Sequence, residues 1–334
     1  MSEFIKLINA INSRHVYIQT HDFPDADATA SAYGLKVLLD KYGYDATICY
    51  SGYIDRCSTS RMMESCNIKM VNMMDIKGQF TDDCIIYVDS QTGNSNISAL
   101  QGENVISIDH HRAYEAKDSR YRFTDIRDNY GACSTIIAKY YFDNNVDMPK
   151  DVATALLFGI KVDTSHMTRG VTKEDLDVFY RLSMMCDTAK IDDLSSNSFK
   201  LEDIALYSKT ISNIEVNNGA AFANAGDNCP EVVIAAVSDF MISIEDIMFS
   251  VVYSVRKTGI KMSVRSKNRH ADAGAMLFNV LKGIGTGGGH SVMAGGFVPF
   301  VCGGKTAEEL ISIIEARFIA ELGMTQKEIY NDVV

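Results

Sequence analysis

The sequence contains no tryptophan, only 4 prolines among its 334 residues, and no tract of low complexity. Chains that stay disordered are usually poor in apolar residues, whereas 46% of this chain is hydrophobic and 22% is charged. We therefore expect a folded protein, and the length is comfortable for two domains.

Signals of export and of membrane insertion are also missing. No apolar run approaches the roughly 18 residues that a membrane-spanning helix needs. The first residues, MSEFIKLINA, show no basic start followed by an apolar core, so a secretory signal is not expected. The eight cysteines form no Cys-x-x-Cys pair, and we expect reduced thiols in a cytoplasmic protein.

An excess of positive charge is absent as well. The chain has 32 basic and 43 acidic residues, which gives a net charge of -11. A protein that coats long duplex nucleic acid is usually basic, because it must neutralise phosphates. We therefore expect neither a long duplex nor a membrane as partner, and favour a small nucleotide or a very short oligonucleotide. The oligomeric state stays open, with a homodimer as one option.

Short β-rich runs alternate with helical stretches in the first half of the chain. Strands are predicted at 16–20, 46–50, 84–88 and 105–108, and helices at 28–42, 131–143, 151–161 and 171–187. Apolar strands that alternate with helices predict an α/β fold with a doubly wound, mostly parallel sheet.

The polar segment 190–205 is predicted to be a linker between a catalytic domain at 1–189 and a smaller α/β domain at 206–334. In the second domain we predict strands at 232–237, 249–255 and 259–264, and helices at 271–282 and 306–322. Two domains joined by a linker predict an active site in the cleft between them.

Histidines and aspartates gather where the predicted elements end. His21, Asp25 and Asp27 follow the first strand, Asp89 follows the strand at 84–88, Asp109, His110 and His111 follow the strand at 105–108, and Asp163 follows the apolar run at 155–162. Taken singly, these aspartates are typical of helix caps and turns. Because the carboxyl ends of parallel strands line one crevice, four such segments together indicate a shared site.

The residue types in this set indicate which metal it would bind. Carboxylates and imidazoles without a thiolate suit Mn²⁺, with Mg²⁺, Co²⁺ or Zn²⁺ as substitutes. Two such ions about 3.5–4 Å apart can share a hydroxide and hold the attacking and leaving oxygens of a phosphoryl group. The sequence therefore predicts a phosphoesterase that binds two divalent ions, with Mn²⁺ as the first expectation.

Five strings of the sequence resemble the motifs of one known family. HDFPDADA, VDS, IDHH and KVDTSHMT resemble the four motifs of the DHH phosphoesterases, and GGGHSVMAG at 287–295 resembles the glycine-histidine motif of the DHHA1 domain that follows. The resemblance covers nearly the whole chain. It implies a DHH catalytic domain and a DHHA1 substrate-binding domain, as in the stand-alone nano-RNases, phosphoadenosine-phosphate phosphatases and linear-dinucleotide phosphodiesterases. RecJ exonucleases share the catalytic domain.

The resemblance also implies a role for each residue. His21 and Asp25 would hold one Mn²⁺, Asp27, His110 and Asp163 would hold the other, and Asp89 would bridge the two. Asp109 would orient a histidine, and His111 would face the scissile phosphate. The chain departs from the family after Asp163, where Thr164–Arg169 replaces a glycine and an aromatic residue, and this puts the substrate in question.

A basic stretch and a glycine run predict the substrate contacts in the second domain. The stretch from Arg256 to His270 contains six basic side chains and no acid. Arg265, whose planar fork suits phosphate, is the predicted phosphate contact, with Ser266 beside it. The backbone N–H groups of Gly288 and Gly289 would approach an anion, and His290 would complete the site. A solvated strand and a flexible turn are the alternatives.

These observations predict hydrolysis of a linear dinucleotide, a nano-RNA or 3′-phosphoadenosine 5′-phosphate by a metal-activated hydroxide. An exopolyphosphatase or pyrophosphatase is the alternative enzyme. Base stacking distinguishes the two, because only a nucleotide site needs a flat aromatic contact. A non-catalytic nucleotide-binding module is a third hypothesis, but such a module is expected to have lost ligands, and none is missing from this sequence.

Overall fold

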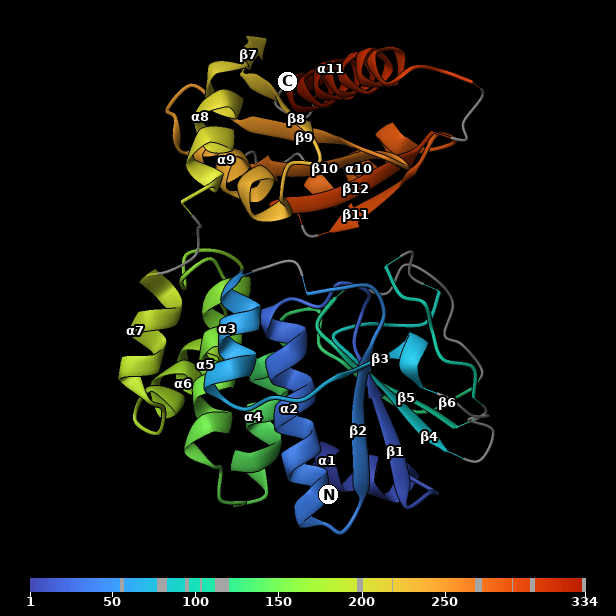
Figure 1. Cartoon of the computed structure of the whole chain (residues 1–334), viewed down its shortest axis with the longest axis vertical. Helices are drawn as coiled ribbons and strands as arrows, with labels where there is room; N and C mark the ends of the chain where they lie inside the picture. Colours follow the sequence, from blue (N-terminus) through green and yellow to red (C-terminus); the bar gives the residue numbers. More distant parts are fainter. Residues whose placement is uncertain are drawn as a thin grey trace. The chain divides into compact units, whose positions relative to one another are not determined.

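The computed structural model describes residues 1–54, 57–76, 83–93, 96–102, 104–111, 120–196, 201–217, 219–267, 272–289, 291–300 and 304–331. The chain divides into two compact units, Met1–Ser198 and Phe199–Val334 (Figure 1). Much of the segment predicted as a linker is helical, because α7 spans Thr188–Ser196 and α8 spans Asp203–Ser212. Ile191 and Leu194, one helical turn apart in α7, are both buried.

The first unit is built on a six-stranded parallel sheet of order β3-β2-β1-β4-β5-β6. Its strands are β1 (His15–Gln19), β2 (Asp45–Tyr50), β3 (Val71–Asn72), β4 (Cys84–Val88), β5 (Asn104–Asp109) and β6 (Tyr121–Ile126). Its other elements are α1 (Glu3–Ala10), α2 (Ala26–Lys41), α3 (Cys57–Ser65), the 3₁₀ turn η1 (Met73–Asp75), α4 (Cys133–Asp143), α5 (Lys150–Asp163) and α6 (Lys173–Ser183). The predicted α/β fold with a parallel sheet is confirmed.

Alternate side chains of the central strands enter two different cores. In β4, Ile86 and Val88 belong to the large core formed with α2, α4 and α5, whereas Ile85 and Tyr87 belong to a smaller core that contains Leu100. A strand buried on both faces needs a continuous apolar run, which explains CIIYV. Within the described residues, helices cover the first face (Figure 1), and η1 and the segment around Leu100 cover the second.

The strand order of the first unit reverses between β1 and β4. The chain moves outward from β1 to β3 and then returns to β4, which pairs with β1 on its other side. At such a switch point the connections leave in opposite directions and open a crevice at the carboxyl ends of the strands. His21 and Asp89 follow the two strands that border this crevice.

The second unit contains a six-stranded sheet of order β11-β12-β10-β9-β8-β7, in which only the β8–β9 pair is parallel among the described pairs. Its strands are β7 (Ile214–Asn217), β8 (Ala220–Asp227), β9 (Phe249–Arg256), β10 (Gly259–Ser266), β11 (Thr286–Gly289) and β12 (Met293–Pro299). Helices α10 (Ala273–Leu281) and α11 (Ala307–Asn331) pack on one face, and α8 and α9 (Glu231–Ser243) pack on the other.

One predicted element of the second unit was wrong. The run VVIAAV at 232–237 was expected to be a strand, but it lies in α9. The buried side chains Val233, Ile234, Val237 and Met241 recur at a helical period that extends beyond the apolar run. Among the described helices of both units, none is long and apolar enough to cross a membrane.

Candidate metal centre

The predicted histidine and aspartate ligands meet at the carboxyl edge of the parallel sheet. Ligand atoms of His21, Asp25 and Asp89 all lie within 4.8 Å of one another, and so do those of Asp27, His110 and Asp163. A third group of the same kind, Asp89, His110 and His111, overlaps both. The structure therefore forms two adjacent ligand groups that are joined through Asp89.

Two members of the first group, His21 and Asp25, lie between β1 and α2. His21 Nδ1 is 2.8 Å from the carbonyl oxygen of Asp22, so an Nδ1–H can donate there and leave the Nε2 lone pair for a metal. His21 Nε2 is 3.7 Å from Asp89 Oδ2 and 4.0 Å from Asp25 Oδ1. Asp25 also caps α2, because its Oδ1 accepts from the backbone N–H of Asp27. The cap and the predicted ligand are thus the same side chain.

Asp89 shows the clearest requirement for a cation. Its side chain is buried, and its backbone adopts a left-handed φ of +57° directly after β4. Its Oδ1 accepts no hydrogen bond from the described residues, although His110 Nε2 lies at 3.3 Å and His111 Nδ1 at 3.5 Å. A buried carboxylate oxygen in this state is unfavourable unless a positive charge compensates it. The residues present therefore fit a divalent ion.

Asp27 belongs to the second group and is fully buried. Its Oδ2 accepts from Cys133 N at 2.7 Å, and its Oδ1 accepts from Ser134 N at 2.9 Å. These N–H groups begin α4, where the helix dipole also favours negative charge. Burial, together with the charges of Asp89 and Asp163, nevertheless raises the pKa of Asp27 well above its ordinary value. A bound cation would oppose that shift and keep the carboxylate ionised.

His110 lies among three carboxylates of the centre. Its Nε2 is 3.2 Å from Asp163 Oδ2, 3.3 Å from Asp89 Oδ1 and 4.0 Å from Asp27 Oδ2. Burial alone would lower the His110 pKa, but Asp163 and Asp89 raise it well above its ordinary value. The same charges attract a metal ion in place of the proton.

A turn at 130–134 orients both Asp27 and His110. His110 Nδ1 lies 3.1 Å from the carbonyl oxygen of Tyr130, and the N–H groups that bind Asp27 follow in the same turn. The buried carboxylate of Asp175 holds this turn, because it accepts from Gly131 N at 2.9 Å and from Thr135 Oγ1 at 2.6 Å.

The supporting role of Asp175 was not predicted. The residue forms a capping box with Thr172 at the start of α6. A Thr-x-x-Asp pattern is ordinary at helix starts, so the pattern does not indicate that this carboxylate also supports the ligand turn.

Asp109 binds the two histidines that follow it. Its Oδ1 accepts from His110 N at 2.8 Å, from His111 N at 3.1 Å and from His111 Nδ1 at 2.8 Å, and its Oδ2 accepts from Gln91 Nε2 at 2.8 Å. Burial opposes ionisation of Asp109, but the charge and hydrogen bond of His111 lower its pKa to about 2. Burial likewise opposes protonation of His111, but Asp109 raises its pKa to about 9. Gln91 was not predicted.

The predicted substrate contacts of the second unit lie at one end of its sheet. Arg265 is opposite Met293, and Gly289 is opposite Ala294 on the same strand. Gly289 has a φ of +150°, and a Cβ there would lie 2.5 Å from the Met293 carbonyl oxygen, so the position requires glycine.

Two neighbours complete this end of the sheet. Ser266 N donates to the carbonyl oxygen of Val292, and the surroundings of Gly288 leave room for a side chain. His290 lies outside the described residues.

The guanidinium of Arg265 is bound within the second unit. Its Nε donates to Asp239 Oδ1 at 2.6 Å, and its Nη1 donates to Ser263 Oγ at 2.8 Å. Lys261 Nζ is likewise 2.9 Å from a carboxylate of α9, that of Glu231. Acids of α9 therefore neutralise part of the basic stretch, and the role of Arg265 as a phosphate contact stays a prediction.

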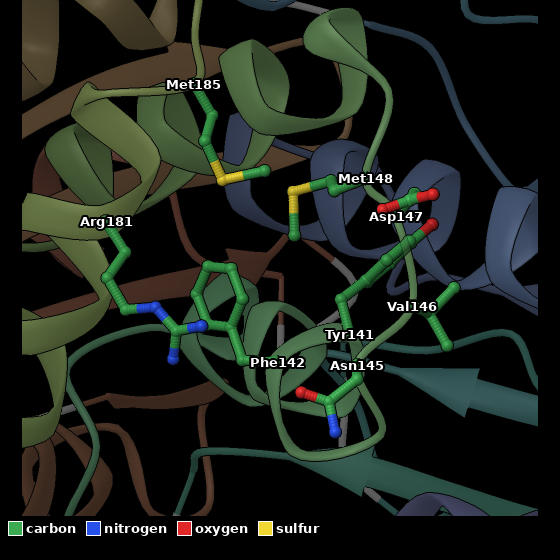
Figure 2. Close-up of a pocket in the computed structure, with 8 residues that line it drawn as sticks. All are labelled: Tyr141, Phe142, Asn145, Val146, Asp147, Met148, Arg181 and Met185. Atoms are coloured by element: carbon green, nitrogen blue, oxygen red, sulfur yellow. The ribbon is translucent and has the colours of Figure 1, made fainter.

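The first unit also contains a pocket that is lined by none of the predicted site residues. It has a volume of about 560 Å³ and is lined by residues around the ends of α4 and α6. The Arg181 guanidinium lies 3.5 Å from the centre of the Phe142 ring, with Met148 and Met185 nearby (Figure 2). The pocket contains none of the predicted ligands, so we assign the chemistry to the metal centre.

Comparison with known proteins identifies the first unit. Residues 15–160 match the family described as DHH family, N-terminal domain. The first unit is a DHH domain. The matched range includes every ligand of the two groups except Asp163, which lies three residues beyond it.

Three similar proteins extend this comparison. The uncharacterized protein MJ1633 of Methanocaldococcus jannaschii is 28% identical over 319 residues, which cover 93% of this chain and 65% of that protein. A probable manganese-dependent inorganic pyrophosphatase of Streptococcus thermophilus is 26% identical over 150 residues, 45% of this chain and 48% of that protein. An exopolyphosphatase-related protein from Bacteroides fragilis shares the fold, with a TM-score of 0.75 and 19% identity over 97% of this chain and 96% of that one.

Proposed function

We propose that the chain is a phosphoesterase that uses two divalent ions, Mn²⁺ first among them, to hydrolyse short phosphorylated nucleotides. Linear dinucleotides, nano-RNA and 3′-phosphoadenosine 5′-phosphate are the substrates we favour. The observation that carries the proposal is the pair of ligand groups joined through Asp89, whose buried Oδ1 accepts no hydrogen bond from the described residues. Paired sites of this kind suit displacement at phosphorus.

The residues divide into ligands and groups that act on the substrate. His21 and Asp25 would hold one ion, Asp27, His110 and Asp163 would hold the other, and Asp89 would contact both. The ions would supply an activated water and stabilise the charge that develops on the phosphoryl oxygens.

His111 is suited to donate a proton to the leaving oxygen. Asp109 binds its Nδ1, which leaves Nε2 for the substrate, and about a third of the side chain is exposed (33%). Asp109 would fix the tautomer and orientation of the ring, and Gln91 would in turn hold the second oxygen of Asp109.

An inorganic pyrophosphatase or exopolyphosphatase is the second candidate. The probable manganese-dependent inorganic pyrophosphatase matches 45% of this chain, and the name of the exopolyphosphatase-related Bacteroides fragilis protein points to the same kind of substrate. The metal ligands alone do not distinguish the two activities, because both require a phosphoryl oxygen between two cations. The choice depends on whether the site also recognises a nucleobase.

A direct assay tests the proposal. Protein stripped with a chelator and reloaded with Mn²⁺ is offered pGpG, pApA, 3′-phosphoadenosine 5′-phosphate, a 24-mer, pyrophosphate and polyphosphate. We expect hydrolysis of the short nucleotides and little of the 24-mer. Asp89→Asn should remove activity, whereas Asp143→Asn, at an exposed position at the end of α4, should not. Full activity of Asp89→Asn would contradict the mechanism.

A further inference from the structure

Two exposed aromatic rings, those of Phe23 and Tyr53, contact each other at the loop that carries the candidate ligands His21 and Asp25. Phe23 stands between His21 and Asp25 in the sequence, and 44% of its surface is exposed. Tyr53 is 56% exposed, and the two ring centroids are 5.0 Å apart with the ring planes at 78°. Aromatic surface is therefore presented to solvent next to carboxylates that face a metal site.

The backbone holds Phe23 in a rare conformation. Its φ is +55°, which a bulky residue seldom adopts. Phe23 N donates to the Ser51 carbonyl oxygen at 2.9 Å, and the preceding Asp22 binds Ser98 through both the N–H and the hydroxyl of that residue. A strained residue persists only where the surrounding structure holds it in place, and such residues are most frequent at ligand-binding and active sites.

The ring of Phe23 is also fixed in position. It packs against the backbone of Gly52, where a Cβ would lie 2.6 Å from two of the ring carbons. Gly52 has a φ of +86°, and its carbonyl oxygen accepts from Asn72 Nδ2 at 2.7 Å. The loop between β2 and α3 thus supplies a flat support that leaves much of the ring accessible.

We propose that Phe23 and Tyr53 form an aromatic subsite that stacks on a nucleobase of the substrate while the adjoining phosphate is held at the metal centre. This inference rests on the proposed function and narrows its substrate class. A nucleobase has apolar π faces that stack on aromatic rings, whereas polyphosphate offers only charged oxygens to them. The subsite therefore favours a base next to the scissile phosphate over inorganic pyrophosphate.

A comparison of two substrates tests the subsite. Phe23→Leu keeps a large apolar side chain and removes the π face. We expect its KM for pApA to rise by about 5- to 150-fold, as for the loss of one stacked base, and its KM for the abasic counterpart of pApA to rise much less. Tyr53→Leu should show the same base dependence, with a smaller rise. Tyr180→Leu, which alters a 68% exposed ring on α6, is the matched control.

A fluorescence measurement keeps this test separate from the proposed function. Binding of 2-aminopurine ribonucleoside 5′-monophosphate to the Mn²⁺-loaded protein should quench the fluorescence of the 2-aminopurine base, and Phe23→Leu should reduce this quenching. Equal KM increases on pApA and on the abasic substrate, or unchanged quenching, would overturn the subsite. Quenching without hydrolysis of any nucleotide would support the subsite and overturn the proposed phosphoesterase activity.

Discussion

Removal of the Asp175 carboxylate is expected to weaken metal binding, although Asp175 does not contact the metal centre. Its Oδ2 accepts from Gly131 N at 2.9 Å, from Thr172 N at 2.8 Å and from Thr172 Oγ1 at 2.7 Å, and its Oδ1 accepts from Thr135 Oγ1 at 2.6 Å. The bond to Gly131 fixes the turn that binds both Asp27 and His110.

The geometry allows the effects of two substitutions to be ranked. In Asp175→Asn, the amide oxygen can replace Oδ2 and keep three acceptor bonds, while the amide N–H₂ faces Thr135, whose hydroxyl can turn to accept. Hydrogen bonds to a charged group contribute about 1.5–3 kcal/mol each, so loss of the charge alone should destabilise the fold by about 1–3 kcal/mol. Asp175→Ala loses every bond and leaves buried donors without partners, so we expect about 3–5 kcal/mol.

Mn²⁺ affinity separates this role from a purely structural one. Groups that orient metal ligands typically change metal affinity by about 10- to 100-fold when they are mutated. We expect that loss for Asp175→Ala and a smaller loss for Asp175→Asn, measured by calorimetry at a temperature where each variant is folded. Glu309→Gln alters a similar capping residue in the second unit, paired with Thr306, and should leave Mn²⁺ affinity unchanged. Wild-type affinity in folded Asp175→Ala would refute the reasoning.

Three further predictions concern the same centre. Gly159→Ala would place a Cβ 2.4 Å from Ser134 Oγ and 3.0 Å from Asp27 Oδ1, so it should lower both the Tm and the Mn²⁺ affinity, and an unchanged Tm would contradict this packing. His110 has a raised pKa and must lose its proton to bind metal, so Mn²⁺ affinity should rise from pH 6 to pH 8, by up to about tenfold per pH unit for each proton released. Calorimetry in two buffers of different ionisation enthalpy counts the protons released on Mn²⁺ binding. An Mn²⁺ affinity that does not change with pH would contradict the coupling. Mn²⁺ at about 100 times its Kd should stabilise the DHH domain by about 2.7 kcal/mol, and EDTA should reverse the shift in thermal unfolding.

The convergence of the candidate ligands could be predicted because a parallel sheet simplifies the geometry. All its strands point the same way, so residues that follow β1, β4 and β5 must lie at one edge whatever the loops do. The buried strand CIIYV was recognisable for a related reason, since both of its faces enter a core. Asp175 and Tyr130 could not be found in this way, because they act through a turn whose sequence carries no metal-binding pattern.

The second unit was harder to predict because its sheet is mostly antiparallel. The basic stretch runs along a hairpin, so Arg256 lies at the turn between β9 and β10 while Arg265 lies near the other end of β10. Glu231 and Asp239, distant in sequence, bind Lys261 and Arg265 from α9, the segment that was mistaken in part for a strand. Basic residues that are close together in the sequence of an antiparallel hairpin therefore do not necessarily form one positively charged surface. The aromatic pair Phe23–Tyr53 has a firmer basis for substrate recognition, because Phe23 lies in the same loop as the candidate metal ligands His21 and Asp25.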